Sequence, residues 1–236
     1  MSETRAADKG KRAAAEAAVS LVADGMTLGL GTGSTVAFAL DALARRIQAE
    51  GLSIRGVPTS ERTAARARAL GIALTDLAAV PALDLAIDGA DEVEEASLCL
   101  IKGHGGALLR EKIVASAARR FVVIVDESKI VPRLGTRMSL PVEVVQFAHV
   151  ATARRLERLA GPAVLRPGAD GAPFITDNGN VIYDVRTPGP IADPASLERD
   201  LDAIVGVVES GLFTHCVERA IVGAADGTVR TLDGGK

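Results

Sequence analysis

The sequence predicts an α/β fold: a mostly parallel sheet with helices on both faces, and a smaller α+β domain after it. Short apolar segments alternate with helical segments up to about residue 125, and residues 83–87 and 121–125 are almost wholly apolar. Strands that alternate with helices and lack a polar face are typical of parallel sheets buried between two helical layers. Beyond residue 135 the order of segments changes to β-α-β-β-α-β.

The first part contains helices and strands in regular alternation. The expected helices span residues 4–23, 36–47, from after Ser60 to Leu70, and from after Gly106 to about Arg119. The expected strands span residues 26–30, 52–57, 83–87, 98–101 and 121–125. Gly71 follows the third helix, where glycine commonly ends a helix.

The pattern beyond residue 135 predicts a small antiparallel unit. Its expected strands span residues 141–145, 164–166, 181–185 and 204–208, and its helices span 148–159 and 194–203, with a β-rich run at 174–176 before the turn at 177–180. Asn178-Gly179 and Asp226-Gly227 each lie between β-rich segments and favour hairpins. The β-α-β-β-α-β order is typical of a ferredoxin-like unit. We expect a catalytic α/β domain at 1–134 and 208–236, and a small α+β domain at 135–207.

Composition excludes several classes of function. The 236 residues carry a net charge of −3 and include six aromatic residues, three His and two Cys. Nucleic-acid binding is not expected, because it needs a basic surface or many aromatic platforms. A zinc site and a disulfide framework are not expected either, and Cys99 and Cys216 are predicted to be buried free thiols. No apolar segment reaches the roughly 18 residues of a membrane span. We therefore expect a cytoplasmic protein.

Three polar or glycine-rich loops each follow a predicted strand. They are Gly31–Thr35, Asp88–Glu92 and Lys102–Gly106. Ligands of open α/β sheets bind beyond the carboxyl ends of the strands. We expect these loops to converge on one crevice.

The loop Gly31-Thr32-Gly33-Ser34-Thr35 leads into a helix. Its backbone N–H groups and hydroxyls can hold a phosphate against the helix dipole. An ordinary helix N-cap is the alternative, because Ser and Thr are favoured there. A dinucleotide fingerprint lacks its third glycine, since Ser34 and Val36 occupy the positions concerned, and no Gly-Lys-[Ser/Thr] follows to make a P-loop.

The segment Asp88-Gly89-Ala90-Asp91-Glu92 places two carboxylates three residues apart after a buried strand. They can face one ligand. A solvent-exposed acidic turn and a Mg²⁺ site are the alternatives.

Lys102 opens a glycine-rich loop and supplies local positive charge that the whole chain lacks. Gly103, Gly105 and Gly106 allow the backbone to approach a ligand closely. His104 has no visible orienting partner, so its imidazole is expected to face solvent instead of acting as a base. Lys129, after another buried strand, is either a second anion contact or an ordinary surface lysine.

Glu111 lies in the first turns of the helix that follows. On a helical wheel it falls about 200° from Leu109 and Ile113, so it faces away from that apolar pair. The interpretations are a general base in a ligand site and an exposed carboxylate favoured by the helix dipole.

Seven motifs together resemble one family over residues 10–232. They are Gly-x-Gly-Thr-Gly-Ser-Thr at 29–35, Pro58-Thr59-Ser60, Asp88–Glu92, Lys102–Lys112, Asp126–Lys129, Leu140–Val144 and Thr176–Asn180. In this order and spacing the chain is similar to ribose-5-phosphate isomerases of the A type. His104 departs from the pattern, which has a small residue there.

The resemblance implies interconversion of D-ribose 5-phosphate and D-ribulose 5-phosphate, in the non-oxidative pentose phosphate pathway, without metal or organic cofactor. It implies a Rossmann-like sheet, a cis-enediolate intermediate and a homodimer or homotetramer. The catalytic residues that it implies are Glu111 as general base, Asp88 and Lys102. The substrate-binding residues that it implies are Thr32, Gly33, Ser34, Thr35, Asp88, Gly89, Ala90, Asp91, Lys102, Gly103, His104, Gly105 and Lys129.

Two other functions compete with this one. A nicotinamide-binding oxidoreductase would use the glycine turn at residues 29–33, but the missing third glycine argues against it. A non-enzymatic sugar-phosphate sensor would need a DNA-binding module. About 25 residues precede the first strand, which is too few for a helix-turn-helix.

Overall fold

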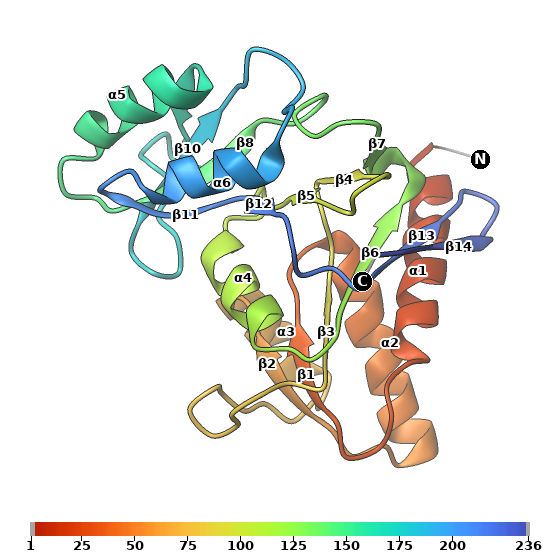
Figure 1. The fold of residues 1–236 in the computed structure, drawn as a ribbon. Coiled ribbons are helices and arrows are strands. Elements are labelled where there is room, and N and C mark those ends of the chain that lie inside the picture. Colours follow the sequence, from red (N-terminus) through yellow and green to blue (C-terminus); the bar gives the residue numbers. More distant parts are fainter. Residues whose placement is uncertain (1–2, 235–236) are drawn as a thin grey trace. The chain divides into compact units, whose positions relative to one another are not determined.

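The computed structural model describes residues 3–234 (Figure 1). The chain forms two compact units. Unit 1 comprises residues 3–90, 110–130 and 216–234, and unit 2 comprises residues 91–109 and 131–215.

Unit 1 is built on a six-stranded sheet in the order β14-β13-β6-β3-β1-β2. The strands are β1 (Thr27–Leu30), β2 (Arg55–Pro58), β3 (Leu85–Asp88), β6 (Phe121–Asp126), β13 (Arg219–Gly223) and β14 (Val229–Asp233). Every neighbouring pair is parallel except β13 and β14, which form the hairpin expected around Asp226-Gly227. The mostly parallel sheet is therefore confirmed.

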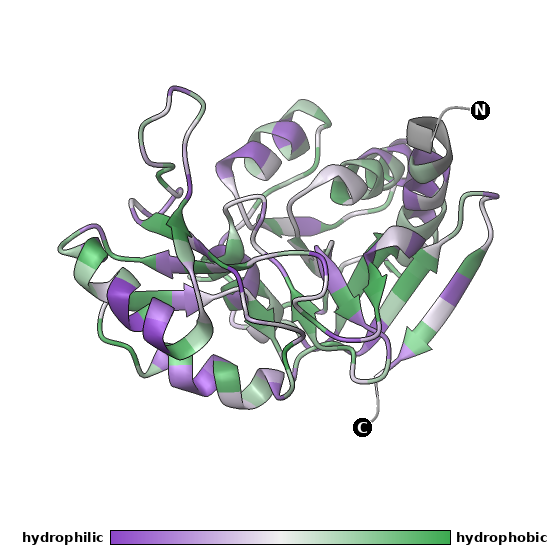
Figure 2. Cartoon of the chain, turned by 90° about the horizontal axis from the view of Figure 1, so that it is seen from above, coloured by the Kyte–Doolittle hydropathy of each residue, from purple (hydrophilic) through white to green (hydrophobic). Residues whose placement is uncertain are grey.

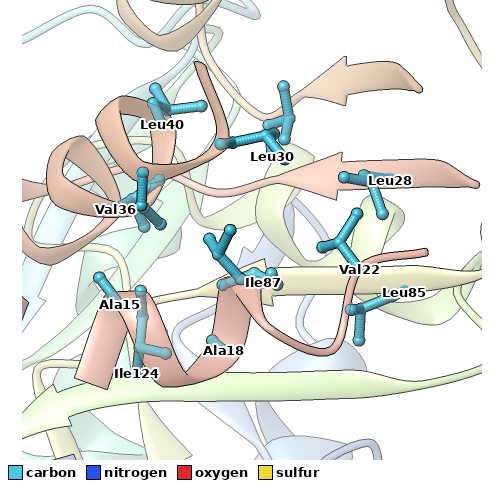
Figure 3. Close-up of a cluster of buried hydrophobic side chains, with 14 of the residues drawn as sticks. Ala15, Ala18, Val22, Leu28, Leu30, Val36, Leu40, Leu85, Ile87 and Ile124 are labelled. Atoms are coloured by element: carbon cyan, nitrogen blue, oxygen red, sulfur yellow. The ribbon is translucent and has the colours of Figure 1, made fainter. Parts of the chain in front are cut away.

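One face of this sheet packs on α1 (Glu3–Val19) and α2 (Ser34–Glu50). Leu28 and Leu30 of β1 point into the same cluster as side chains of both helices, such as Ala18 and Val36 (Figure 3). Side chains alternate along a strand, so the residue between the two leucines faces the other way.

The opposite face packs on α4 (Leu108–Ser116). The residue between the leucines is Gly29, and a Cβ there would lie 2.5 Å from Val114 Cγ1 and 2.8 Å from Ala86 Cβ. Glycine is required because α4 approaches the backbone of β1 closely. Helices thus cover both faces, and α3 (Glu61–Ala69) follows β2.

Unit 2 contains an antiparallel sheet in the order β11-β8-β10-β9. Its elements are β8 (Leu140–Val144), α5 (His149–Ala160), β9 (Ala163–Leu165), β10 (Val181–Val185), α6 (Pro194–Asp202) and β11 (Val207–Ser210). Leu156 of α5 and Leu201 of α6 are buried against Val142 and Val144. This order is the expected ferredoxin-like arrangement. Figure 2 shows hydrophilic and hydrophobic residues alternating along its helices.

A third, smaller sheet was not expected. It has the order β12-β5-β4-β7, with β4 (Glu92–Glu94), β5 (Leu100–Ile101), β7 (Ile130–Val131) and β12 (Leu212–Phe213). The expectation that Asp88–Glu92 is entirely a loop is wrong, because β3 ends at Asp88 and β4 begins at Glu92. Glutamates are depleted in strands, so the composition of β4 concealed it. The turn expected around Asn178-Gly179 brings Ile175 and Val181 together in an isolated antiparallel bridge, without a regular strand at 174–176.

Residues 91–109 pack within unit 2, although the sequence places them in the larger domain. The compact units describe packing alone, and the domain division at residues 134 and 208 stays a prediction. Among the described residues, no helix is both long and apolar enough to cross a membrane.

Candidate active site

Asp88 ends β3 and is 3% exposed. Its Oδ1 atom accepts the N–H groups of Thr32, at 2.9 Å, and of Gly89, at 2.7 Å. The bond from Thr32 connects the ends of the neighbouring parallel strands β1 and β3. The first acid of the acidic motif is therefore a buried, oriented carboxylate and not part of a solvent-exposed turn.

Gly31 makes this approach of the two strand ends feasible. A Cβ at this position would lie 2.1 Å from Asp88 Oδ1 and 2.6 Å from Asp88 Cα. Any side chain would push the carboxylate or the strand away.

The hydroxyl of Thr32 belongs to a buried hydroxyl cluster with Thr59, Ser60 and Thr63. Thr32 Oγ1 lies 2.8 Å from Thr59 Oγ1, 2.8 Å from Ser60 Oγ and 3.1 Å from Thr63 Oγ1. Ser60 also caps α3 by accepting the Thr63 N–H, and Thr63 Oγ1 donates to the Gly31 carbonyl at 2.8 Å. The cluster therefore fixes the glycine loop to the start of α3.

The start of α2 remains open to solvent. Gly33 is its N-cap, with φ at 125°, and no side chain in the described part of the chain caps the helix. Gly33 and Ser34 are exposed and line a cavity of about 360 Å³ together with Arg62 and Arg66. Arg66 pairs with Asp41 at 2.8 Å, whereas Arg62 has no partner within residues 3–234. Uncapped helix N–H groups beside an arginine favour an anion.

Glu111 lies on α4 and is 4% exposed. The helical wheel correctly separated it from Ile113, and of the two interpretations the exposed carboxylate is wrong. Ile113 is 46% exposed, and Val114 and Ala115 share the buried side with Glu111. Charged side chains are rarely buried this deeply outside a paired or functional environment.

Lys129 lies in the short 3₁₀ turn Glu127–Lys129 that follows β6. Asp126 caps this turn by accepting the Ser128 N–H at 3.0 Å. Lys129 is half-buried, and no side chain in the described part of the chain pairs with it.

Lys102 is buried in unit 2, at 2% exposure. Its N–H donates to the Gly211 carbonyl at 2.9 Å, and its Nζ lies 5.6 Å from the centroid of the Phe213 ring. A Cβ at Gly211 would lie 2.3 Å from the Lys102 carbonyl oxygen, so the two backbones are in direct contact. Lys102 is thus fixed at both its backbone and its ammonium group.

The loop after Lys102 is held from several sides within unit 2. The His104 N–H donates to Asp91 Oδ2 at 3.0 Å, and a Cβ at Gly106 would lie 2.5 Å from the Phe174 ring. Arg166 Nη1 donates to the carbonyls of Gly103, at 2.9 Å, and His104, at 3.2 Å. Sequence reasoning missed Arg166, because a single arginine in a Pro/Gly-rich segment carries no motif.

The structure corrects one further expectation, that for His104. The His104 ring is half-buried, and its Nε2 donates to the Ser139 carbonyl at 3.0 Å instead of facing solvent. A carbonyl cannot donate, so this bond places a proton on Nε2. Glu92 accepts three backbone N–H groups, from Gly135, Arg137 and Met138 at 2.6–2.8 Å, and so organises a loop.

No group of three or more His, Cys, Asp or Glu side chains suited to a metal ion occurs among residues 3–234. Unit 1 thus carries the buried acids Asp88 and Glu111, and unit 2 carries the buried Lys102 with the oriented backbone of its loop. Such groups can bind a polar anionic molecule and move protons.

The family model described as ribose 5-phosphate isomerase A (phosphoriboisomerase A) matches residues 55–227. The curated relative from Synechococcus sp. (strain JA-3-3Ab) is named ribose-5-phosphate isomerase A. It is 55% identical over 221 residues, which are 94% of this chain and 96% of the relative. The relative of the same name from Thermomicrobium roseum is 53% identical over 226 residues, which are 96% of this chain and 94% of the relative.

Two solved structures are similar over nearly the whole chain. Ribose 5-phosphate isomerase A from Methanocaldococcus jannaschii has a TM-score of 0.90 and 46% identity, covering 94% of this chain and 97% of that one. A D-ribose-5-phosphate isomerase in complex with phospho-erythronic acid has a TM-score of 0.92 and 41% identity, covering 96% of this chain and 99% of that one.

Proposed function

Because the chain belongs to the ribose 5-phosphate isomerase A family, we propose that it interconverts D-ribose 5-phosphate and D-ribulose 5-phosphate. The observation that carries the proposal is the 55% identity to a curated isomerase over 94% of the chain. The complex of a similar structure with phospho-erythronic acid, a four-carbon phosphosugar acid, supports the substrate class.

Aldose–ketose isomerisation moves two protons. One is removed from C2 and delivered to C1, and the other moves from the C2 hydroxyl to the C1 oxygen. Glu111 is the proposed base for the carbon protons, with a cis-enediolate as intermediate. One carboxylate on one face of a planar intermediate can both remove and return the proton. Its 4% exposure supports the role, because a base works best where water is excluded.

Asp88, Asp91 and Lys102 are proposed to complete the chemistry. Lys102 stabilises the developing negative oxygen, while Asp88 holds the sugar hydroxyls and assists ring opening together with Asp91. Asp88 and Asp91 bound one four-residue segment, which includes the proposed contacts Gly89 and Ala90. Lys102 and Glu111 are separated by one short loop and the first turn of α4.

The remaining proposed contacts bind the phosphate and the hydroxyls. They are Thr32–Thr35, the loop Gly103–Gly105 and Lys129. Among residues 3–234, no side chain caps the start of α2 and none pairs with the half-buried Lys129, and both observations support this role.

We also propose a homodimer or homotetramer in the cytoplasm. Phe147 is 90% exposed and Val205 79% exposed, and large exposed apolar side chains are typical of association surfaces. Light scattering of the purified chain measures the assembly directly, and a monomer at micromolar concentration would contradict it.

The activity is tested with ribose 5-phosphate and the purified chain, following ribulose 5-phosphate formation. We expect turnover that is unchanged by dialysis against EDTA and needs no nicotinamide. Absence of turnover by folded protein would reject the isomerase, and loss of activity in EDTA would reject a metal-free reaction.

A further inference from the structure

Arg166 lies immediately after β9 and forms a two-pronged ion pair with Asp184 of β10. Its Nε lies 2.9 Å from Asp184 Oδ2, and its Nη2 lies 2.5 Å from Oδ1. The two side chains are 12% and 24% exposed. This pairing fixes the plane of the guanidinium group and leaves Nη1 directed at the carbonyls of Gly103 and His104.

The two peptide groups that Arg166 contacts differ at their N–H ends. In the Gly103–His104 peptide, the carbonyl accepts a hydrogen bond from Arg166 and the N–H donates one to Asp91 Oδ2. The His104–Gly105 peptide also has its carbonyl on Arg166. This peptide is trans, so the Gly105 N–H points away from Arg166, opposite to the His104 carbonyl.

The Gly105 N–H has no acceptor among the described residues, and Gly105 is exposed. An oriented backbone donor that the protein itself leaves unused is what an oxyanion site requires. Ion pairs shielded from water contribute little net stability and are better suited to fixing one geometry, and this pair is half-buried. The ion pair of Arg166 with Asp184 is therefore suited to orienting the Gly105 N–H.

We propose that Arg166 is a positioning residue of the isomerase, and that it holds the Gly105 N–H toward the oxygen that becomes negative in the enediolate. The proposal rests on the function proposed above. It adds Arg166 and Asp184 to that function, and it gives Gly105 a defined role through its N–H.

The test compares Arg166→Met and Arg166→Lys with the unaltered enzyme. Three constants are measured: kcat, KM for ribose 5-phosphate, and the inhibition constant of phospho-erythronic acid, whose planar anionic carboxylate resembles the enediolate. Loss of an oxyanion donor costs about 10²-fold in kcat. We expect Arg166→Met to lower kcat by about this factor and to weaken the inhibitor by a similar factor, because both depend on the charged intermediate. KM should change little. For Arg166→Lys, kcat and the inhibition constant should lie between those of Arg166→Met and the unaltered enzyme, because lysine lacks the planar fork of the guanidinium group.

A second variant separates positioning from folding. Arg166→Met leaves the half-buried Asp184 carboxylate without its partner, which destabilises the unit. The double variant Arg166→Met/Asp184→Asn removes that charge, so we expect its thermal stability to recover while kcat and the inhibition constant remain impaired. Arg133→Met is the matched control, because Arg133 is exposed and donates to the Ala192 carbonyl away from the loop. It should leave all three constants unchanged.

Two results would overturn the proposal. One is a fall in kcat with an unchanged inhibition constant, which indicates only a smaller folded fraction. The other is recovery of kcat together with stability in the double variant. Failure of the isomerase function itself is distinguishable, because the unaltered enzyme would then not turn over ribose 5-phosphate.

Discussion

Asp88, Lys102 and Glu111 are charged residues with less than 5% of their surface exposed. Removing a charge from water costs several kcal/mol, so such residues are retained mainly where chemistry or a fixed geometry requires them. Their identities were predictable from motifs. The burial of Glu111 was not, because the apolar residue Ile113 on the other side of α4 is the exposed one.

Gly31 offers a test of the Asp88 geometry at the level of one atom. Gly31→Ala would place a methyl group 2.1 Å from Asp88 Oδ1 and so displace the carboxylate. We expect a loss of about 1–3 kcal/mol in the free energy of unfolding and a fall of at least about tenfold in kcat/KM. Urea denaturation and steady-state kinetics measure these.

Gly189→Ala is the control, because a Cβ there meets nothing within 4 Å and its φ is not positive. Wild-type kcat/KM in Gly31→Ala would contradict the tight approach of the two strand ends.

At the scale of elements, the parallel strands and long helices followed from apolar runs and helical periodicity. The short strands did not. β4 consists of Glu92, Val93 and Glu94, and its formation depends on a partner strand that the local sequence does not specify. The carboxylate of Glu92 is satisfied by backbone N–H groups of residues 135–138, some forty residues away. Local patterns cannot encode such a contact.

The buried hydroxyl cluster joins α3 to the glycine loop, and Thr63 is its link to the Gly31 carbonyl. Thr63→Val keeps the shape but removes that donor. Because an unsatisfied buried group costs about 1–3 kcal/mol, we expect a loss of that size in urea denaturation.

Thr231→Val, at an exposed position of β14, serves as the comparison and should change the unfolding free energy by less than about 0.5 kcal/mol. An equal effect of the two substitutions would show that the cluster does not stabilise the loop.

At the scale of the whole chain, composition predicted the class of the protein better than its details. The scarcity of aromatic residues excluded stacking platforms, yet Phe213 and Phe174 contact Lys102 and Gly106. The expectation of two buried free thiols holds for Cys99, whereas Cys216 is only half-buried. Arg166 and Asp184 could not be found from the sequence, because their role depends on carbonyls about 60 residues away.

The two thiols should differ in reactivity. Burial raises the pKa of the Cys99 thiol, since the thiolate is poorly solvated there. A raised pKa leaves less thiolate at neutral pH, and the reactive fraction grows as the pH rises. We expect N-ethylmaleimide to modify Cys216 first at pH 7, as read by mass spectrometry of peptides. In Cys216→Ser, labelling should be slow and should accelerate with pH, whereas rapid labelling of Cys99 at pH 7 would contradict its burial.

The proposed role of Glu111 is to move the carbon-bound proton. It is tested by proton NMR of ribose 5-phosphate in D₂O with the unaltered chain, Glu111→Gln and the exposed control Glu157→Gln. Glutamine preserves the shape of Glu111 but cannot accept the proton, and general-base catalysis is worth about 10²–10⁴-fold. We predict that the unaltered chain and Glu157→Gln form ribulose 5-phosphate and exchange carbon-bound protons with solvent. Glu111→Gln, folded by circular dichroism, should do both at least about 10²-fold more slowly. Exchange at C2 by Glu111→Gln at the unaltered rate would contradict the account.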